Sequence, residues 1–146
     1  MSLQKLIVRT YTDTDKKKVV DIWEQCDLVV PWNHPETDIN IKKHFQPDLF
    51  LVGEIDNLIV ATVMAGFEGH RGWINYLAVL PDFQKQGVGR EIMQEAERRL
   101  RELDCPKINL QVRSSNKDII AFYESIGFTQ DDVISLGKRL DGRKKK

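Results

Sequence analysis

The sequence predicts a mixed α/β fold, and three patterns carry that prediction. Short runs rich in Val, Ile, Leu and aromatic residues alternate with segments whose apolar residues recur at helical spacing. Three β-type runs follow one another in the middle of the chain, which is typical of an antiparallel meander. A long amphipathic helix then joins the last of these runs to a further strand, as a right-handed crossover would.

The first part of the chain predicts a strand and two helices. Residues 6–11, LIVRTY, form the strand, and the Thr and Asp residues after it can cap a helix that reaches Cys26. Two prolines break regular structure over residues 27–37 and predict a loop. A short helix is expected over residues 36–44.

The middle of the chain predicts three strands joined by tight turns. Residues 49–67 contain two β-type runs around Asp56 and Asn57, a pair typical of a hairpin turn. The segment EGHRG at 68–72 forms a second turn, and WINYLAVL at 73–80 forms the third strand.

The second half of the chain predicts a helix, a strand, a helix and a strand. The helix over residues 87–103 has the clearest pattern, because apolar residues share one face and Glu–Arg pairs four residues apart occupy the other. Residues 107–113 form a strand, and residues 115–128 form a helix that Asn116 could cap. The alternating residues 134–140 predict a last strand.

Composition and charge narrow the class of protein. The chain has 146 residues, so we expect one domain over residues 1–140 and a disordered basic tail over residues 141–146. Lys plus Arg and Asp plus Glu number 22 each, so the net charge creates no overall electrostatic field that would favour binding of nucleic acid. No apolar run approaches the ~18 residues of a membrane span. Cys26 and Cys105 fit no metal or redox motif, so we expect a cytoplasmic protein with reduced cysteines.

The segment QKQGVG, residues 84–89, is the strongest local signal for function. It lacks the residues of a P-loop, and Ile92 stands where a dinucleotide-binding fingerprint needs a third glycine. The glycines can simply ease a tight turn from strand to helix. Alternatively, they let phosphates approach the amides at the positive end of the helix, with Lys85 and Arg90 adding charge.

Two motifs resemble the GCN5-related N-acetyltransferases, the GNAT family. Gln84, Gly87 and Gly89 match that family's Q/R-x-x-G-x-G/A at the start of a helix. Downstream, NKDIIAFYESIGF resembles its second signature, which begins at Asn116. The resemblance extends more weakly over residues 6–140, where PWN, GHRG and SLGKRL resemble a bacterial subgroup of small, YpeA-like members.

The resemblance implies a mostly antiparallel, twisted sheet with a V-shaped splay between two central parallel strands, and flanking helices. It implies transfer of an acetyl group from acetyl-CoA to a primary amine, by direct attack on the thioester in a ternary complex. A non-catalytic acyl-CoA-sensing domain on the same scaffold is the alternative, because a fold does not fix an activity.

The resemblance also assigns roles to residues. The amides of the glycine turn would bind the pyrophosphate, and the strand before it would pair with the pantetheine arm and polarise the acetyl carbonyl. Asn116 would contact the arm, and Tyr123 would protonate the leaving thiolate as the catalytic acid. The implied cofactor-binding residues are Leu77, Ala78, Val79, Gln84, Lys85, Gln86, Gly87, Val88, Gly89, Arg90, Asn116 and Tyr123.

The general base is left open by the sequence. Residues 73–76 contain neither a carboxylate nor a histidine, which departs from family members that place a Glu on this strand. Glu68 and His70, in the preceding turn, are the nearest candidates, and we assign the role to Glu68. Tyr76 is a weaker base, since a phenol has a pKa near ~10. A chain of water molecules is a further alternative.

The resemblance implies that the loop 27–37 and the region 129–133 flank the cleft that receives the acceptor amine. Trp32, Asn33 and Tyr76 are the assigned substrate residues, and nearby acidic groups suit a cationic amine. These aromatic, amide and acidic candidates are Trp32, Asn33, Glu36, Asp38, Asp131 and Asp132. We expect a small-molecule or peptide amine as partner, with no metal, nucleic acid or membrane; a homodimer is common among small family members.

Overall fold

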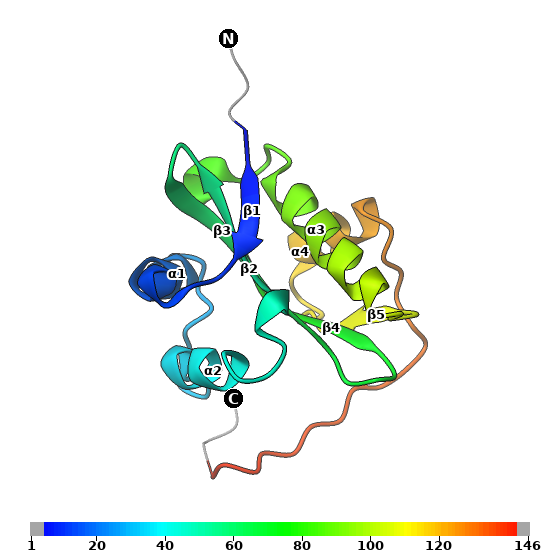
Figure 1. Cartoon of the computed structure of the whole chain (residues 1–146). Helices are drawn as coiled ribbons and strands as arrows, with labels where there is room; N and C mark the ends of the chain where they lie inside the picture. The colour runs from blue at the N-terminus through cyan, green and yellow to red at the C-terminus, as the bar shows by residue number, and fades with distance from the viewer. Residues whose placement is uncertain (1–4, 143–146) are drawn as a thin grey trace. The chain divides into compact units, whose positions relative to one another are not determined.

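The computed structural model describes residues 5–142 and divides the chain into two compact units, Met1–Leu110 and Gln111–Lys146 (Figure 1). The expected single domain over 1–140 stays a prediction, and residues 143–146 of the basic tail lie outside the described residues. Within residues 5–142, no helix combines the length and the apolar content that crossing a membrane requires.

The first unit contains most of the regular structure, in nearly the order that the sequence predicts. Its strands and helices are β1 (Ile7–Thr10), α1 (Lys16–Gln25), α2 (Pro35–Lys42), β2 (Phe50–Ile55), β3 (Leu58–Phe67), β4 (Gly72–Val79), α3 (Val88–Glu102) and β5 (Ile108–Leu110). The strands form one sheet in the order β1-β2-β3-β4-β5, antiparallel except for the parallel pair β4–β5. The predicted mixed α/β class is therefore confirmed, with α3 as the crossover.

The sheet of the first unit is covered on both faces. Figure 1 shows α1 and α2 on one side of the strands and α3 on the other. The side chain of Trp23 on α1 is fully buried, and its Nε1 donates to Thr62 Oγ1 of β3 at 2.9 Å. On the opposite face, α3 buries the apolar stripe that its sequence predicts: Val88, Ile92, Met93, Ala96 and Leu100.

The hairpin between β2 and β3 confirms the predicted turn. Asp56 and Asn57 both have positive φ, +50° and +65°, as the two central residues of a type I′ turn require. Such a turn twists in the same sense as the strands that it joins. A short polar sequence therefore fixes the register of two largely buried strands.

The strand β4 is fully paired on one side and only partly on the other. Along β3 it pairs from Gly72 to Val79, with a bulge that places two residues, Tyr76 and Leu77, opposite one. Along β5 it pairs only over Gly72–Ile74. Within the described part of the first unit, the rest of that edge of β4 has no neighbouring strand.

The second unit contains one helix, α4 (Lys117–Ser125), and the predicted strand over residues 134–140 is wrong. This segment has no regular structure, and the Ile134 and Leu136 side chains are 87% and 91% exposed. An alternating apolar pattern forms a strand only where a second strand supplies hydrogen-bond partners. The described residues of this unit contain no other strand.

The ends of α4 follow its sequence closely. The Asn116 side chain caps the helix, since its Oδ1 accepts the backbone N–H of Ile119 at 3.3 Å. Gly127 follows the helix with a φ of +104°, the left-handed conformation that commonly ends helices.

Candidate functional site

The glycine turn leads directly into the longest helix. Gly87 is the N-cap of α3 and has a φ of +86°, which a residue without a Cβ adopts at no steric cost. The backbone N–H of Glu91 donates to the Gly87 carbonyl at 3.0 Å and begins the helical ladder. In an α-helix, the first N–H groups lie before the ladder of helical hydrogen bonds, and they carry the positive end of the helix dipole.

Two glutamine side chains brace this turn, one against the end of β4 and one within the turn itself. Gln84 Nε2 donates to the Val79 carbonyl at 2.9 Å, and Gln86 Nε2 donates to the Asp82 carbonyl at 3.0 Å. The backbone of the turn remains exposed, while the Val88 side chain is buried in the core. Val88 can therefore contribute only its backbone to a ligand at this position.

The unpaired edge of β4 lies next to the same turn. The Leu80 N–H donates to Val60 on β3 at 2.8 Å. Because backbone groups alternate sides along a strand, the Leu77 and Val79 amides point away from β3. The predicted arm-binding residues Leu77 and Val79 thus direct their N–H groups to the edge that β5 leaves open, while the Val79 carbonyl already accepts from Gln84 Nε2 and Cys26 Sγ. An extended ligand can add to such an edge as a further strand.

The bulge in β4 sets the position of Tyr76. This residue has a φ of +53°, which costs a non-glycine residue about 1–2 kcal/mol. Several contacts offset that cost. Its ring stacks on Trp23 at 3.8 Å between centroids, and its carbonyl accepts from Thr62 Oγ1 at 2.8 Å.

The Tyr76 hydroxyl donates to a carboxylate on α2. Its Oη lies 2.5 Å from Asp38 Oδ2. Sequence reasoning placed both residues near the acceptor but did not connect them, because they lie 38 positions apart with no spacing signal between them.

Glu68 lies in the turn that precedes β4. Its carboxylate accepts the backbone N–H groups of His70 at 2.6 Å and Arg71 at 2.5 Å, and these bonds lower its pKa. Glu68 is exposed and precedes the strand. From Gly72, the extended chain rises about 17 Å to Leu77 at ~3.3 Å per residue. The structure therefore does not bring Glu68 together with Leu77, and its assignment as the base stays a prediction.

Asn116 and Tyr123 belong to the second unit, so their action together with the glycine turn stays a prediction. Tyr123 is 9% exposed, and its ring makes edge contacts with Phe122 and Phe128, at 5.2 and 5.4 Å between centroids. Burial raises the pKa of Tyr123 to about 12. Its hydroxyl therefore keeps its proton at neutral pH.

The predicted substrate residues Trp32 and Asn33 lie in the loop between α1 and α2. The Asn33 side chain donates to the Leu28 carbonyl at 3.3 Å, and its backbone N–H donates to Val30 at 2.9 Å. These bonds hold the loop in a turn. Both side chains remain partly exposed and can meet a ligand.

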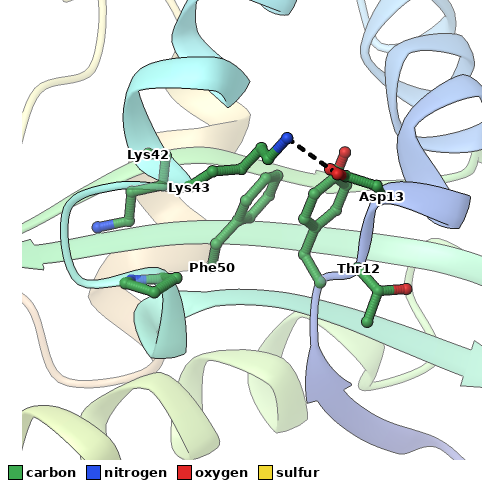
Figure 2. Close-up of a pocket in the computed structure, with 7 residues that line it drawn as sticks. Thr12, Asp13, Lys42, Lys43 and Phe50 are labelled. Atoms are coloured by element: carbon green, nitrogen blue, oxygen red, sulfur yellow. Dashed lines mark ion pairs between the residues drawn. The ribbon is translucent and has the colours of Figure 1, made fainter.

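A pocket that sequence reasoning missed lies beside α2 (Figure 2). Its volume is about 200 Å³, and the stacked rings of Tyr11 and Phe50 form part of its wall. Figure 2 shows the ion pair between Lys43 and Asp13 at this pocket, with the Lys42 amine pointing away from it. Sequence reasoning missed this pocket because no pattern in the sequence distinguishes a lysine that points toward the sheet from one that is exposed.

Lys42 is a buried cation without a carboxylate partner among the described residues. Its Nζ donates to the Ala65 carbonyl, and the residue is only 7% exposed. Burial lowers the pKa of Lys42 to about 8. The folded chain therefore loses this proton at a lower pH than the unfolded chain, in which a lysine titrates near ~10.4.

Replacing Lys42 with Met is expected to stabilise the protein more at neutral than at alkaline pH. Burial of the charged Lys42 amine lowers the free energy of unfolding below pH ~8, and this loss disappears as pH rises toward ~10.4. The difference in unfolding free energy between Lys42→Met and wild type should fall by about 2 kcal/mol from pH 7 to pH 10. Urea unfolding at both pH values measures it, with Lys43→Met as the control. A difference that is the same at both values contradicts the prediction.

These features define the class of the protein. The sheet is open with one parallel pair, a glycine begins α3, and no strand in the described first unit pairs with the adjoining edge of β4. This is the scaffold that the resemblance implies for acetyltransferases that use a CoA thioester. The chain belongs to the acetyltransferase (GNAT) family, whose model matches residues 17–128.

Curated relatives agree with this membership. An acetyltransferase of Pectobacterium atrosepticum is 44% identical over 133 residues, covering 91% of this chain and 94% of the relative. An acetyltransferase of Sodalis glossinidius is 43% identical over 134 residues, with the same coverage of both chains.

Solved structures show the same fold at lower identity. The aminoglycoside acetyltransferase AAC(6')-Iy, in complex with a bisubstrate analogue of CoA and acetylneamine, has a TM-score of 0.75 and 16% identity, covering 92% of this chain and 99% of that one. The Escherichia coli ribosomal-protein-S18-alanine N-acetyltransferase has a TM-score of 0.73 and 23% identity, with coverage of 87% and 79%. Glucosamine-6-phosphate N-acetyltransferase of Arabidopsis thaliana has a TM-score of 0.69 and 20% identity, with coverage of 94% and 100%.

Proposed function

We propose that the protein transfers an acetyl group from acetyl-CoA to a primary amine, by direct attack of the amine on the thioester. The observation that carries this proposal is the junction of β4 and α3. There, an exposed glycine turn at the positive end of a fifteen-residue helix adjoins a strand edge with which no strand in the described part of the first unit pairs. The first feature suits a pyrophosphate and the second suits a peptide-like arm.

The residues present fit acetyl-CoA. Apart from its own neighbours in the chain, a Cβ at Gly87 would meet no atom of residues 5–142 within 4 Å, so these residues leave the space above the turn open to a ligand. The pyrophosphate binds the amides from Gly87 to Arg90, and Lys85 adds positive charge. The pantetheine arm pairs with the Leu77 and Val79 N–H groups, as in strand addition.

The chemistry follows from this placement. A backbone amide near Leu77 or Ala78 polarises the acetyl carbonyl as negative charge develops on its oxygen. Attack by the neutral amine forms the amide bond and expels the CoA thiolate. Tyr123, still protonated at neutral pH, supplies the proton that the thiolate takes up.

The acceptor belongs to the class of primary amines. The half-buried Asp38 carboxylate beside the partly exposed loop of Trp32 and Asn33 supports a cationic amine. The structural neighbours supply suitable probes, since their names cite an acetylated neamine, glucosamine 6-phosphate and the alanine of a ribosomal protein.

Calorimetric titration with acetyl-CoA tests the cofactor. We expect acetyl-CoA, CoA and desulfo-CoA to bind with micromolar affinity and ATP to bind far more weakly, since ATP lacks the pantetheine arm. Absence of binding by all three CoA compounds would contradict the proposal.

A panel of amines tests the transfer itself. The probes are neamine, glucosamine 6-phosphate, spermidine and a peptide that begins with alanine, with acetylation detected by mass spectrometry. Transfer to any of them supports the enzyme. Tight binding of acetyl-CoA with no transfer to any amine favours the alternative, an acyl-CoA-sensing domain.

A further inference from the structure

We propose that Asp38 and Tyr76 together take the proton from the acceptor amine, with Tyr76 as the group that contacts the amine and Asp38 as the final proton acceptor. This inference rests on the proposed function. It supplies the base that the sequence leaves open, from two residues on different elements of the first unit.

The bulge of β4 places Tyr76 at the point where the reaction is proposed to occur. Tyr76 precedes Leu77 and Ala78, whose backbone is proposed to bind the acetyl group. The positive φ of Tyr76 and its stacking on Trp23 direct its ring toward the α1 and α2 face of the sheet. A residue held in a sparsely populated conformation by several contacts has a position fixed more tightly than an ordinary strand residue.

The hydrogen bond between the two residues has the direction that a proton relay needs. Tyr76 Oη donates its hydrogen to Asp38 Oδ2 at 2.5 Å, which is a short, charge-assisted bond. A phenol oxygen that donates its hydrogen retains lone pairs that can accept one from an amine. Asp38 is only half-buried on α2, so a proton that it takes up can pass on to solvent.

The proton transfer balances in one step. The neutral amine attacks the acetyl carbon, and the nitrogen becomes positively charged and acidic as the N–C bond forms. Its N–H bond breaks toward Tyr76 Oη while the Tyr76 O–H bond breaks toward Asp38. Asp38 is then protonated, Tyr76 is again a neutral phenol, and the Asp38 proton passes to solvent after the thiolate leaves.

Two isosteric variants separate this role from a structural one. In Asp38→Asn, the amide oxygen still accepts the Tyr76 hydrogen bond but cannot take up a proton. Loss of a general base typically lowers turnover about 10²–10⁴-fold, so we expect kcat to fall about 100-fold in Asp38→Asn and in Tyr76→Phe. Because the two residues act as a unit, the double variant should be no slower than either single variant. Acetyl-CoA affinity, measured by calorimetry, should change by less than about two-fold, since no acyl-CoA contact is removed.

Matched controls are available in the same unit. Asp21→Asn changes a helical aspartate that accepts from Gln25 on α1, and Tyr11→Phe changes a buried tyrosine in the wall of the pocket beside α2. Both controls should keep kcat within about two-fold of wild type.

The same panel of four amines distinguishes the outcomes. Wild-type turnover that survives in Asp38→Asn, or losses that multiply in the double variant, overturn the relay and leave the proposed function standing. A wild-type chain that acetylates none of the four amines overturns the proposed function, and the relay fails with it.

Discussion

The Trp23→Ala variant is expected to lose about 4 kcal/mol of unfolding free energy, within the range that truncating a buried tryptophan usually costs. The Trp23 side chain is fully buried, and it joins rings on two strands, Phe50 at 6.2 Å and Tyr76 at 3.8 Å between centroids. Its removal leaves a large cavity and also leaves Thr62 Oγ1 without its indole donor. Both effects act at the centre of the α1 face.

Chemical unfolding in urea measures this loss. Because ordinary domains are stable by only ~5–15 kcal/mol, the alanine variant could fail to fold, and Trp23→Phe then provides the test. Phenylalanine keeps an aromatic ring but loses the hydrogen bond, so a loss of about 2 kcal/mol is expected. The control is Trp73→Phe, at a side chain that is 39% exposed, and it should change stability by less than ~1 kcal/mol. Equal effects at Trp23 and Trp73 would contradict the argument.

The Gly87→Val variant is expected to weaken acetyl-CoA binding about 100-fold, or about 2.7 kcal/mol. A valine at a φ of +86° is strained, so the turn should shift. Its side chain would also enter the open space where the pyrophosphate is proposed to bind. Each lost hydrogen bond from an amide to a charged phosphate costs about 1.5–3 kcal/mol.

Gly69→Val is a matched control for this measurement. Gly69 has a φ of +106° and, like Gly87, would place its Cβ in open space. It lies in the turn before β4, away from the glycine turn. Both variants should lose similar stability, but only Gly87→Val should lose acetyl-CoA affinity in calorimetry. Equal affinity in the two variants would remove the glycine turn from the cofactor site.

Local signals explain what could be predicted from the sequence. The Asp56–Asn57 turn, the apolar stripe of α3 and the Asn116 cap each depend on residues within one element. Positive φ, helical periodicity and capping are local preferences, and the surrounding fold reinforces them here.

The features that escaped prediction depend on distant partners. The bulge at Tyr76 changes the register by one residue, and nothing in the strand's own sequence marks it. The bond from Tyr76 to Asp38 spans 38 positions. The segment 134–140 has a strand-like pattern, but the described residues of its own unit contain no strand that could pair with it, and no pattern in a single segment reveals whether a partner strand exists.

The bulge also changes, partway along β4, which face of the sheet the even-numbered side chains occupy. A Cβ at Gly72 would meet Leu100 of α3, so the even-numbered positions before the bulge, Gly72 and Ile74, face α3. Ala78 has the same even parity, yet it lies across from Thr62, whose hydroxyl meets α1. One extra residue thus moves the even-numbered side chains of β4 from the α3 face of the sheet to the α1 face. The number of residues between Ile74 and Ala78 is therefore under stricter constraint than their identity. A single insertion or deletion there would move every side chain in the second half of β4 to the opposite face of the sheet.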